Sequence, residues 1–133
     1  MTDQTKIAVI GCGRWGRNII RNTAELGALA AVIDIDMARA TDFANQFDCD
    51  ALSLQDALQR DDISGLMIAT DAATHCQIAT TALQAGKHVF IEKPMAMSLA
   101  EATTIQTQAD SHNKQVMIGH LIRYHPAFQA LEA

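Results

Sequence analysis

The chain has few cysteines, no excess of basic residues and no long apolar run. Its 133 residues include three cysteines, Cys12, Cys49 and Cys76, an odd number without the spacing of a zinc site. No apolar stretch approaches the roughly 20 residues of a membrane span. A formal net charge of −5 argues against non-specific binding to nucleic acid. We therefore expect no metal site, no membrane segment and no nucleic-acid partner.

The first residues also lack the pattern of an export signal. Residues 1–6 contain no charged region that leads into an apolar core. An odd number of unpaired cysteines fits a reducing compartment better than a disulfide framework. We expect a cytoplasmic protein with reduced thiols.

Short apolar runs alternate along the chain with segments of helical spacing. The second helix has Asp36 as its cap, and in the first helix Ile19, Ile20, Ala24 and Leu26 are candidate core contacts. The alternation predicts an α/β fold of Rossmann type, a doubly wound parallel sheet of about six strands with helices on both faces. Strands are predicted at 6–10, 29–33, 50–52, 65–69, 87–91 and 116–119, and helices at 14–26, 36–47, 54–59, 74–85, 98–111 and from Pro126.

A glycine-rich turn follows the first predicted strand directly. Gly11 permits the tight turn, Gly13 lets phosphate oxygens approach the backbone, and Gly16 lets the following helix lie close to the strand. The unpaired N–H groups of the first helical turn then face the anion, aided by the helix dipole. This arrangement predicts a site for the pyrophosphate of a dinucleotide.

An acidic residue, Asp34, ends the second predicted strand, 23 residues after Gly11. A carboxylate there would accept hydrogen bonds from both ribose hydroxyls of the adenosine and would repel a 2′-phosphate, which favours NAD over NADP. The alternative is a strand-end aspartate that caps the next turn, although Asp36 can fill that role.

Several side chains of the turn have two interpretations. Arg14 and Arg17 either contact a phosphate or remain solvated, and Trp15 either shields the pyrophosphate or packs under the next loop. Cys12 is interpreted as a small filling residue because no base lies near it in the sequence.

Glu92, Lys93 and Pro94 follow the fifth predicted strand, at the edge where open parallel sheets bind ligands. A lysine before a proline has a restricted backbone, so its ammonium could donate to a substrate oxygen or shuttle a proton. The alternative is an ordinary surface lysine in a turn.

Taken in order, these motifs resemble the N-terminal domain of the glucose-fructose oxidoreductase / inositol dehydrogenase (Gfo/Idh/MocA) family. The resemblance is carried by the glycine turn, Asp34, Thr70, His75 and residues 85–89 running into Glu92-Lys93-Pro94. Residues 119–128 resemble the crossover of that family into its second domain. One departure is Asp71-Ala72-Ala73, where the family often has prolines.

The resemblance implies an enzyme that transfers hydride between a nicotinamide cofactor and a ring carbon of a sugar, nucleotide sugar or cyclitol. It implies NAD as the cofactor, Lys93 as the catalytic lysine and a cis Lys93–Pro94 peptide. The implied cofactor-binding residues are Gly11, Gly13, Arg14, Trp15, Gly16, Asp34, Thr70, His75, Glu92 and Lys93, and the implied substrate-binding residues are Lys93, His120, Arg123 and Tyr124.

The resemblance also implies a domain division. We expect residues 1–120 to form the NAD(P)-binding domain and residues 121–133 to begin a crossover helix into a C-terminal substrate domain absent from this chain. The full-length form is expected to be a homo-oligomer, and the isolated chain to bind dinucleotide with little turnover. Two alternatives remain open at this point, a non-catalytic dinucleotide-sensing module and a biliverdin-reductase-like member of the same family.

Overall fold

The computed structural model describes residues 4–133, so residues 1–3 of the N-terminal segment that is predicted to lack an export signal lie outside the described part. Its six strands form one parallel sheet in the order β3-β2-β1-β4-β5-β6, which confirms the predicted Rossmann fold. The strands are β1 (Lys6–Ile10), β2 (Leu29–Ile33), β3 (Asp50–Ala51), β4 (Ile63–Ile68), β5 (His88–Ile91) and β6 (Val116–Ile118). The helices are α1 (Gly16–Glu25), α2 (Met37–Phe47), α3 (Leu54–Gln59), α4 (His75–Gln84), α5 (Leu99–Ser111) and α6 (Pro126–Glu132), with 3-10 turns η1 (Ala72–Thr74) and η2 (Leu121–Tyr124).

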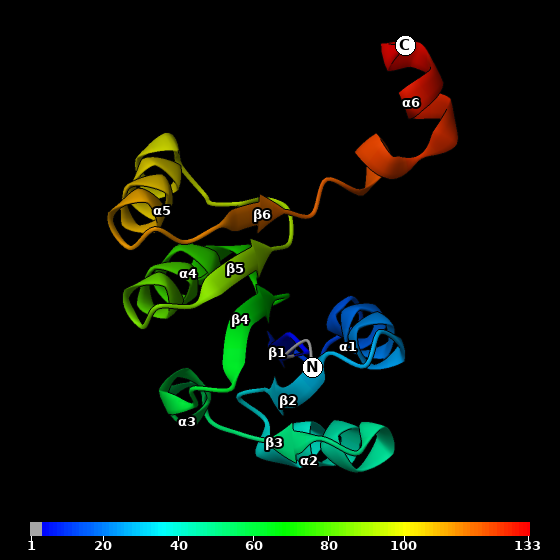
Figure 1. The fold of residues 1–133 in the computed structure, drawn as a ribbon, viewed down its shortest axis with the longest axis vertical. Helices are drawn as coiled ribbons and strands as arrows, with labels where there is room; N and C mark the ends of the chain where they lie inside the picture. Colours follow the sequence, from blue (N-terminus) through cyan, green and yellow to red (C-terminus); the bar gives the residue numbers. More distant parts are fainter. Residues whose placement is uncertain (1–3) are drawn as a thin grey trace.

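Helices cover both faces of the sheet, as Figure 1 shows. Helices α1 and α2 bury Ile20 and Phe43 against one face, in a cluster that includes Val9 of β1. Helices α3, α4 and α5 pack on the other face, where Leu83 and Ile105 join the core. The strand order reverses between β1 and β4, and ligands of open parallel sheets bind outside the carboxyl ends of the strands at such a point.

Side-chain caps start several of the helices at the expected residues. The Asp36 carboxylate accepts from the N–H groups of Ala38 and Arg39 at 3.1 and 3.2 Å, which confirms it as the cap of α2. Ser98 accepts from the Glu101 N–H at the start of α5, and the Glu101 carboxylate accepts in return from the Met97 N–H at 2.8 Å. Each cap satisfies donors that a helix N-terminus leaves unpaired.

The first helix is shorter than its periodicity predicts, and one of its expected core contacts is wrong. Helix α1 begins at Gly16, and Leu26, which follows its last residue, is 78% exposed. Thr23 is buried instead, because its hydroxyl donates to the Ile19 carbonyl at 2.7 Å and so leaves no unpaired group. Strand β4 begins at Ile63, two residues earlier than predicted, because Ile63 already pairs with Lys6 of β1. Gly65 therefore lies inside the strand.

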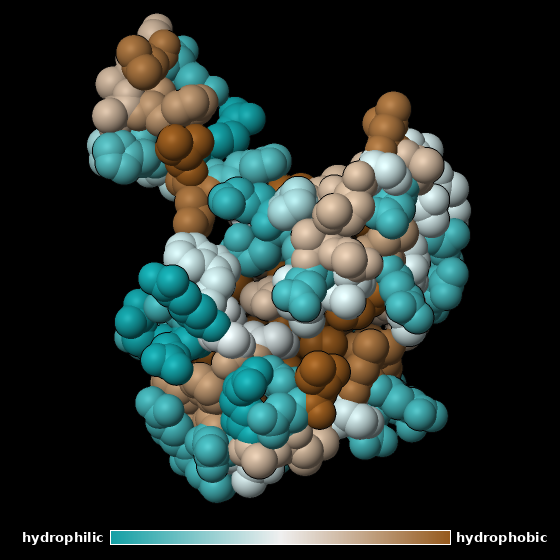
Figure 2. Space-filling view, turned by 180° about the vertical axis from the view of Figure 1, so that it is seen from behind, coloured by the Kyte–Doolittle hydropathy of each residue, from teal (hydrophilic) through white to brown (hydrophobic). Residues whose placement is uncertain are grey.

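The C-terminal residues project from the sheet. Helix α6 begins at Pro126, and His125 caps it by accepting from the Ala127 N–H at 3.2 Å. Figure 2 shows hydrophobic residues along this projection, at its upper left. Leu131 of α6 is 86% exposed. None of the helices in residues 4–133 is long and apolar enough to cross a membrane.

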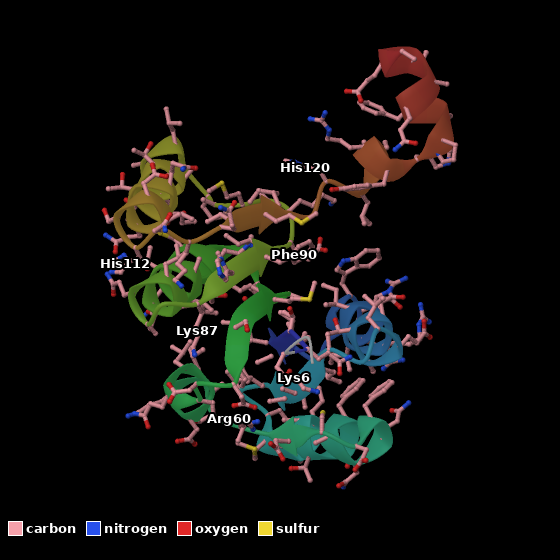
Figure 3. The ribbon with its side chains drawn as sticks, in the orientation of Figure 1. Lys6, Arg60, Lys87, Phe90, His112 and His120 are labelled. Carbon is pink, nitrogen blue, oxygen red and sulfur yellow. The ribbon has the colours of Figure 1, made fainter. Side chains whose placement is uncertain are left out.

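Lys87 is buried at the opposite end of the strands from the glycine turn. It is 7% exposed, and its ammonium donates to the carbonyl oxygens of Arg60 and Ile63 at 2.6 and 2.8 Å. Figure 3 shows Lys87 on the side of the sheet where Arg60 and α3 lie. These two bonds join the start of β5 to the segment that enters β4.

Replacing Lys87 by methionine should therefore destabilise the domain. The Lys87→Met side chain keeps the aliphatic stem but removes both hydrogen bonds of the ammonium, and the Arg60 carbonyl then keeps only the longer bond from the Ile63 N–H, at 3.4 Å. The expected loss is about 2 kcal/mol in the free energy of unfolding. Urea denaturation followed by circular dichroism measures it, with Lys114→Met as the matched control. Equal midpoints for the two variants would contradict the role of the ammonium.

Candidate functional site

Two of the three glycines in the turn are required by the protein's own packing. Gly11 has φ +98°, and a Cβ there would lie 2.5 Å from the carbonyl oxygen of Ala69, just after β4. A Cβ on Gly16 would overlap the carbonyl oxygen of Gly11, so only glycine lets α1 begin so close to the turn. Glycine at Gly11 and Gly16 therefore allows the turn to lie close to β4 and α1.

Gly13 differs from its neighbours because nothing in the described chain requires it to be glycine. A Cβ on Gly13 would meet no atom within 4 Å, and its φ lies outside the left-handed region. The N–H groups from Gly13 to Gly16 have no hydrogen-bond partner among residues 4–133. Open space, free donors and the positive end of α1 therefore coincide, which is the arrangement that an anion needs.

Asp34 lies just beyond β2, with its carboxylate directed at the glycine turn. One oxygen accepts from the Cys12 N–H and the other from the Asp36 N–H, both at 2.8 Å. The side chain is 6% exposed, and the Arg39 guanidinium lies 3.6 Å from it. Asp36 caps α2 itself, whereas Asp34 caps the turn between β2 and α2 through the Asp36 N–H, which is the alternative role expected of it. Its bond to the Cys12 N–H also joins it to the glycine turn.

Cys12 is 2% exposed, and its sulfur lies 3.7 Å from the Ile33 carbonyl oxygen. Burial, and next the negative charge of Asp34, raise the pKa of this thiol to about 12. The thiol therefore stays protonated near neutrality, which agrees with a filling residue and not a nucleophile.

The basic and aromatic side chains of the turn lie apart from one another. Arg14 is exposed, whereas the Arg17 guanidinium lies 6.0 Å from the centre of the Phe43 ring on α2. Trp15 is 45% exposed and lines a groove of about 720 Å³ between α1 and strands β4, β5 and β6. Glu92 lines the same groove.

A second group of predicted residues meets where β4 and β5 end. His75, the first residue of α4, is 1% exposed, and its ring lies between two backbone carbonyl oxygens. Nδ1 is 2.8 Å from the oxygen of Pro94, and Nε2 is 3.0 Å from that of Thr70. The Thr70 hydroxyl is 2.7 Å from the Thr74 hydroxyl. His75 therefore lies beneath this edge and joins its two loops, and neither ring nitrogen is free.

Lys93 is exposed and follows directly on the buried Glu92. No side chain within residues 4–133 forms a hydrogen bond or ion pair with its ammonium, and the Lys93–Pro94 peptide is cis. Glu92 is 8% exposed, and its carboxylate lies against Gly119, where a Cβ would be 2.8 Å from Oε1. A free cation and a carboxylate are thus adjacent in sequence at the carboxyl end of β5.

The remaining predicted substrate residues lie past the end of β6. Figure 3 places His120 where the chain leaves the sheet, and η2 then carries Arg123 and Tyr124. Arg123 lies 3.4 Å from the Glu132 carboxylate of α6, and Tyr124 is 62% exposed. The local contacts of these two residues are therefore with α6 and solvent.

Three features of the site had no signal strong enough for prediction from sequence. Arg39 lies beside Asp34 because α2 turns back over the end of β2. Gly119 makes room for the Glu92 carboxylate, and its only sequence signal is a glycine that follows an apolar strand. The Pro94 carbonyl receives His75 from a segment 19 residues away.

The model of an oxidoreductase family with an NAD-binding Rossmann fold, Gfo/Idh/MocA, matches residues 5–120. The UDP-N-acetylglucosamine 3-dehydrogenase of Acidithiobacillus ferrooxidans is 36% identical over 95% of this chain and 40% of its own length. Inositol 2-dehydrogenase 1 of Paenarthrobacter aurescens is 32% identical over 100% of this chain and 41% of its own.

Solved structures similar to this chain include that of one of these relatives. The structure of the same Acidithiobacillus enzyme superposes with a TM-score of 0.92 at 34% identity, over 97% of this chain and 41% of that one. GenD2 from gentamicin A biosynthesis, solved in complex with NAD, has a TM-score of 0.92 at 28% identity, over 98% and 38%. The chain spans about 40% of the length of the relatives that it matches. It belongs to the Gfo/Idh/MocA oxidoreductase family, and residues 5–120 match the family's NAD-binding Rossmann domain.

Proposed function

We propose that this chain is the cofactor-binding part of an NAD-dependent dehydrogenase that acts on a ring carbon of a sugar, nucleotide sugar or cyclitol. Residues 1–120 form the dinucleotide domain in this proposal, and residues 121–133 begin the crossover helix. The observation that carries the proposal is the open space around Gly13, beside N–H groups that have no partner among residues 4–133. The sugar-type substrate rests on the names of the relatives, one a nucleotide-sugar dehydrogenase and one an inositol dehydrogenase.

The turn would hold the pyrophosphate of the cofactor through its backbone. The N–H groups from Gly13 to Gly16 would donate to phosphate oxygens, with the dipole of α1 adding to the attraction. Arg14 is exposed close to these donors and forms no ion pair within residues 4–133, so its guanidinium could approach a phosphate. Trp15, on the rim of the groove, would cover the cofactor from the side of α1.

Asp34 would select NAD in this arrangement. Its carboxylate lies at the edge beyond β2, where it would accept from the ribose hydroxyls while it keeps its bond to the Cys12 N–H. Its negative charge opposes a 2′-phosphate, and the neighbouring Arg39 opposes this preference only in part because its guanidinium is half exposed.

Lys93 would handle the proton of the reaction. When bound, the nicotinamide supplies the acceptor or donor of hydride. A neutral Lys93 amine would take the proton of the substrate hydroxyl as the carbon loses hydride, and in the reverse direction the ammonium would return it. Glu92 and Thr70, on either side of this edge, would orient the nicotinamide half, and His120, Arg123 and Tyr124 would contact the substrate.

The role of Gly13 predicts a variant that folds but does not bind. A Cβ in Gly13→Ala meets no protein atom, so its melting temperature should match that of the parent chain, whereas its affinity for NADH should fall by about tenfold or more, since every 1.4 kcal/mol is tenfold. Fluorescence titration measures the binding. Gly16→Ala is the matched control, and it should lower the melting temperature because its Cβ overlaps Gly11. Unchanged NADH binding by Gly13→Ala would reject the site.

The role of Asp34 predicts a change in cofactor preference. The parent chain should bind NADH more tightly than NADPH. Asp34→Asn keeps an oxygen for the Cys12 N–H, loses the bond from the Asp36 N–H and removes the charge. The ratio of the two dissociation constants should therefore shift toward NADPH by about tenfold. Asp42→Asn is a control on the exposed face of α2. Equal binding of both cofactors by the parent chain would refute this assignment.

The role of Lys93 predicts a loss of turnover without a loss of cofactor binding. In the protein expressed from its complete reading frame, Lys93→Met should lower kcat for NAD⁺ reduction with UDP-N-acetylglucosamine or myo-inositol by about a hundredfold or more. The dissociation constant of NADH should stay within about threefold of the parent value, because Lys93 would contribute at most one hydrogen bond to cofactor binding. Lys114→Met serves as the control. A Lys93→Met protein that keeps the parent rate would favour a different proton carrier, and binding with no turnover in any of the proteins would favour a sensing module.

A further inference from the structure

We infer that His75 is a positioning residue, which fixes the turn that carries Lys93 through a hydrogen bond from Nδ1–H to the Pro94 carbonyl. This inference rests on the proposed function of Lys93. The His75 ring is 1% exposed, and its two nitrogens face the backbone carbonyl oxygens of Pro94 and Thr70.

The bond to Pro94 must have its hydrogen on His75. A carbonyl oxygen can only accept, and a neutral imidazole carries one N–H, so we place the hydrogen on Nδ1, which makes the shorter of the two contacts, at 2.8 Å. The second nitrogen lies 3.0 Å from the carbonyl oxygen of Thr70, on the loop after β4. The imidazole therefore spans the two loops that hold the residues at the ends of β4 and β5.

Lys93 lies between two residues whose backbone is held by hydrogen bonds, and the bond from His75 to Pro94 is one of the two. Before Lys93, the Glu92 N–H donates to the Ile68 carbonyl at 2.9 Å and so attaches the chain to β4. After it, the Pro94 carbonyl is held by His75. Lys93 and Pro94 are themselves exposed, so packing restrains them little, and the two hydrogen bonds fix the direction in which the lysine leaves the backbone.

Residues 95–97, which follow the Lys93 turn, have contacts of their own that do not involve His75. Met95 and Ala96 are half-buried against the core, and the Met97 N–H donates to the Glu101 carboxylate. These contacts keep the segment attached to α5 when His75 is changed. Loss of the His75 bond should therefore loosen the Lys93 turn without unfolding the domain.

Two amide substitutions separate the two ring nitrogens. The amide nitrogen of asparagine can take the place of Nδ1, and that of glutamine the place of Nε2. His75→Asn should therefore keep the bond to Pro94, His75→Gln should keep only the one to Thr70, and His75→Phe should keep neither. The pair is matched in polarity and in hydrogen-bonding groups, so it tests which contact matters.

Nitrogen-15 relaxation of the 133-residue chain, with no cofactor and no substrate, gives a measurement that does not depend on activity. The Lys93 and Met95 amides should have order parameters of about 0.85 in the parent chain and in His75→Asn, and below about 0.6 in His75→Gln and His75→Phe. Amides of β1 should be unchanged in all four proteins. Equal order parameters at Lys93 in the Asn and Gln variants would overturn the inference.

Kinetics of the protein from its complete reading frame give the second measurement. With NAD⁺ and UDP-N-acetylglucosamine or myo-inositol, His75→Gln should lower kcat about tenfold or more, His75→Asn should stay within about threefold, and KM for NAD⁺ should change little in both. Equal loss of kcat in both variants would overturn the inference and indicate a purely structural histidine. If the parent protein shows no turnover, the proposed function fails, and the relaxation data still decide the role of His75.

Discussion

The contact between Gly16 and the carbonyl oxygen of Gly11 is the constraint on which the site depends. Helix α1 begins so close to the turn that no side chain fits between them. The N–H groups from Gly13 to Gly16, at the start of this helix, have no hydrogen-bond partner among residues 4–133. The positive end of the helix and its free donors therefore face the same open space, and an anion can fill it without displacing any protein contact.

The second half of the site depends on how the ends of β1, β4 and β5 are joined. The Ala69 N–H donates to the Ile10 carbonyl, and the Glu92 N–H donates to the Ile68 carbonyl, both at 2.9 Å. Gly11 then packs against Ala69, so the glycine turn and the loop after β4 share one edge. Because the sheet order reverses at β1 and β4, the helices of the two halves diverge there and leave this edge open.

His75 illustrates the difference between a motif and a geometry. The resemblance to a family identifies the residue as part of a functional region, where a histidine suggests contact with a ligand. In the fold, both of its nitrogens face backbone carbonyls, and the ring is buried at the start of α4. His75 thus connects the loop after β4 to the loop after β5, while the exposed Lys93 has no partner among residues 4–133.

The sequence alone determined the alternation of strands and helices, the cap Asp36 and the glycine turn, because these depend on neighbouring residues and on apolar periodicity. It was less reliable at helix ends, where Leu26 is exposed and Thr23 is buried. Tertiary structure alone decided that the Cys12 N–H and Asp34 pair, that Arg39 lies beside them, and that His75 reaches Pro94. These contacts join residues from different strands and helices, so their geometry exists only once the sheet has brought the strand ends together.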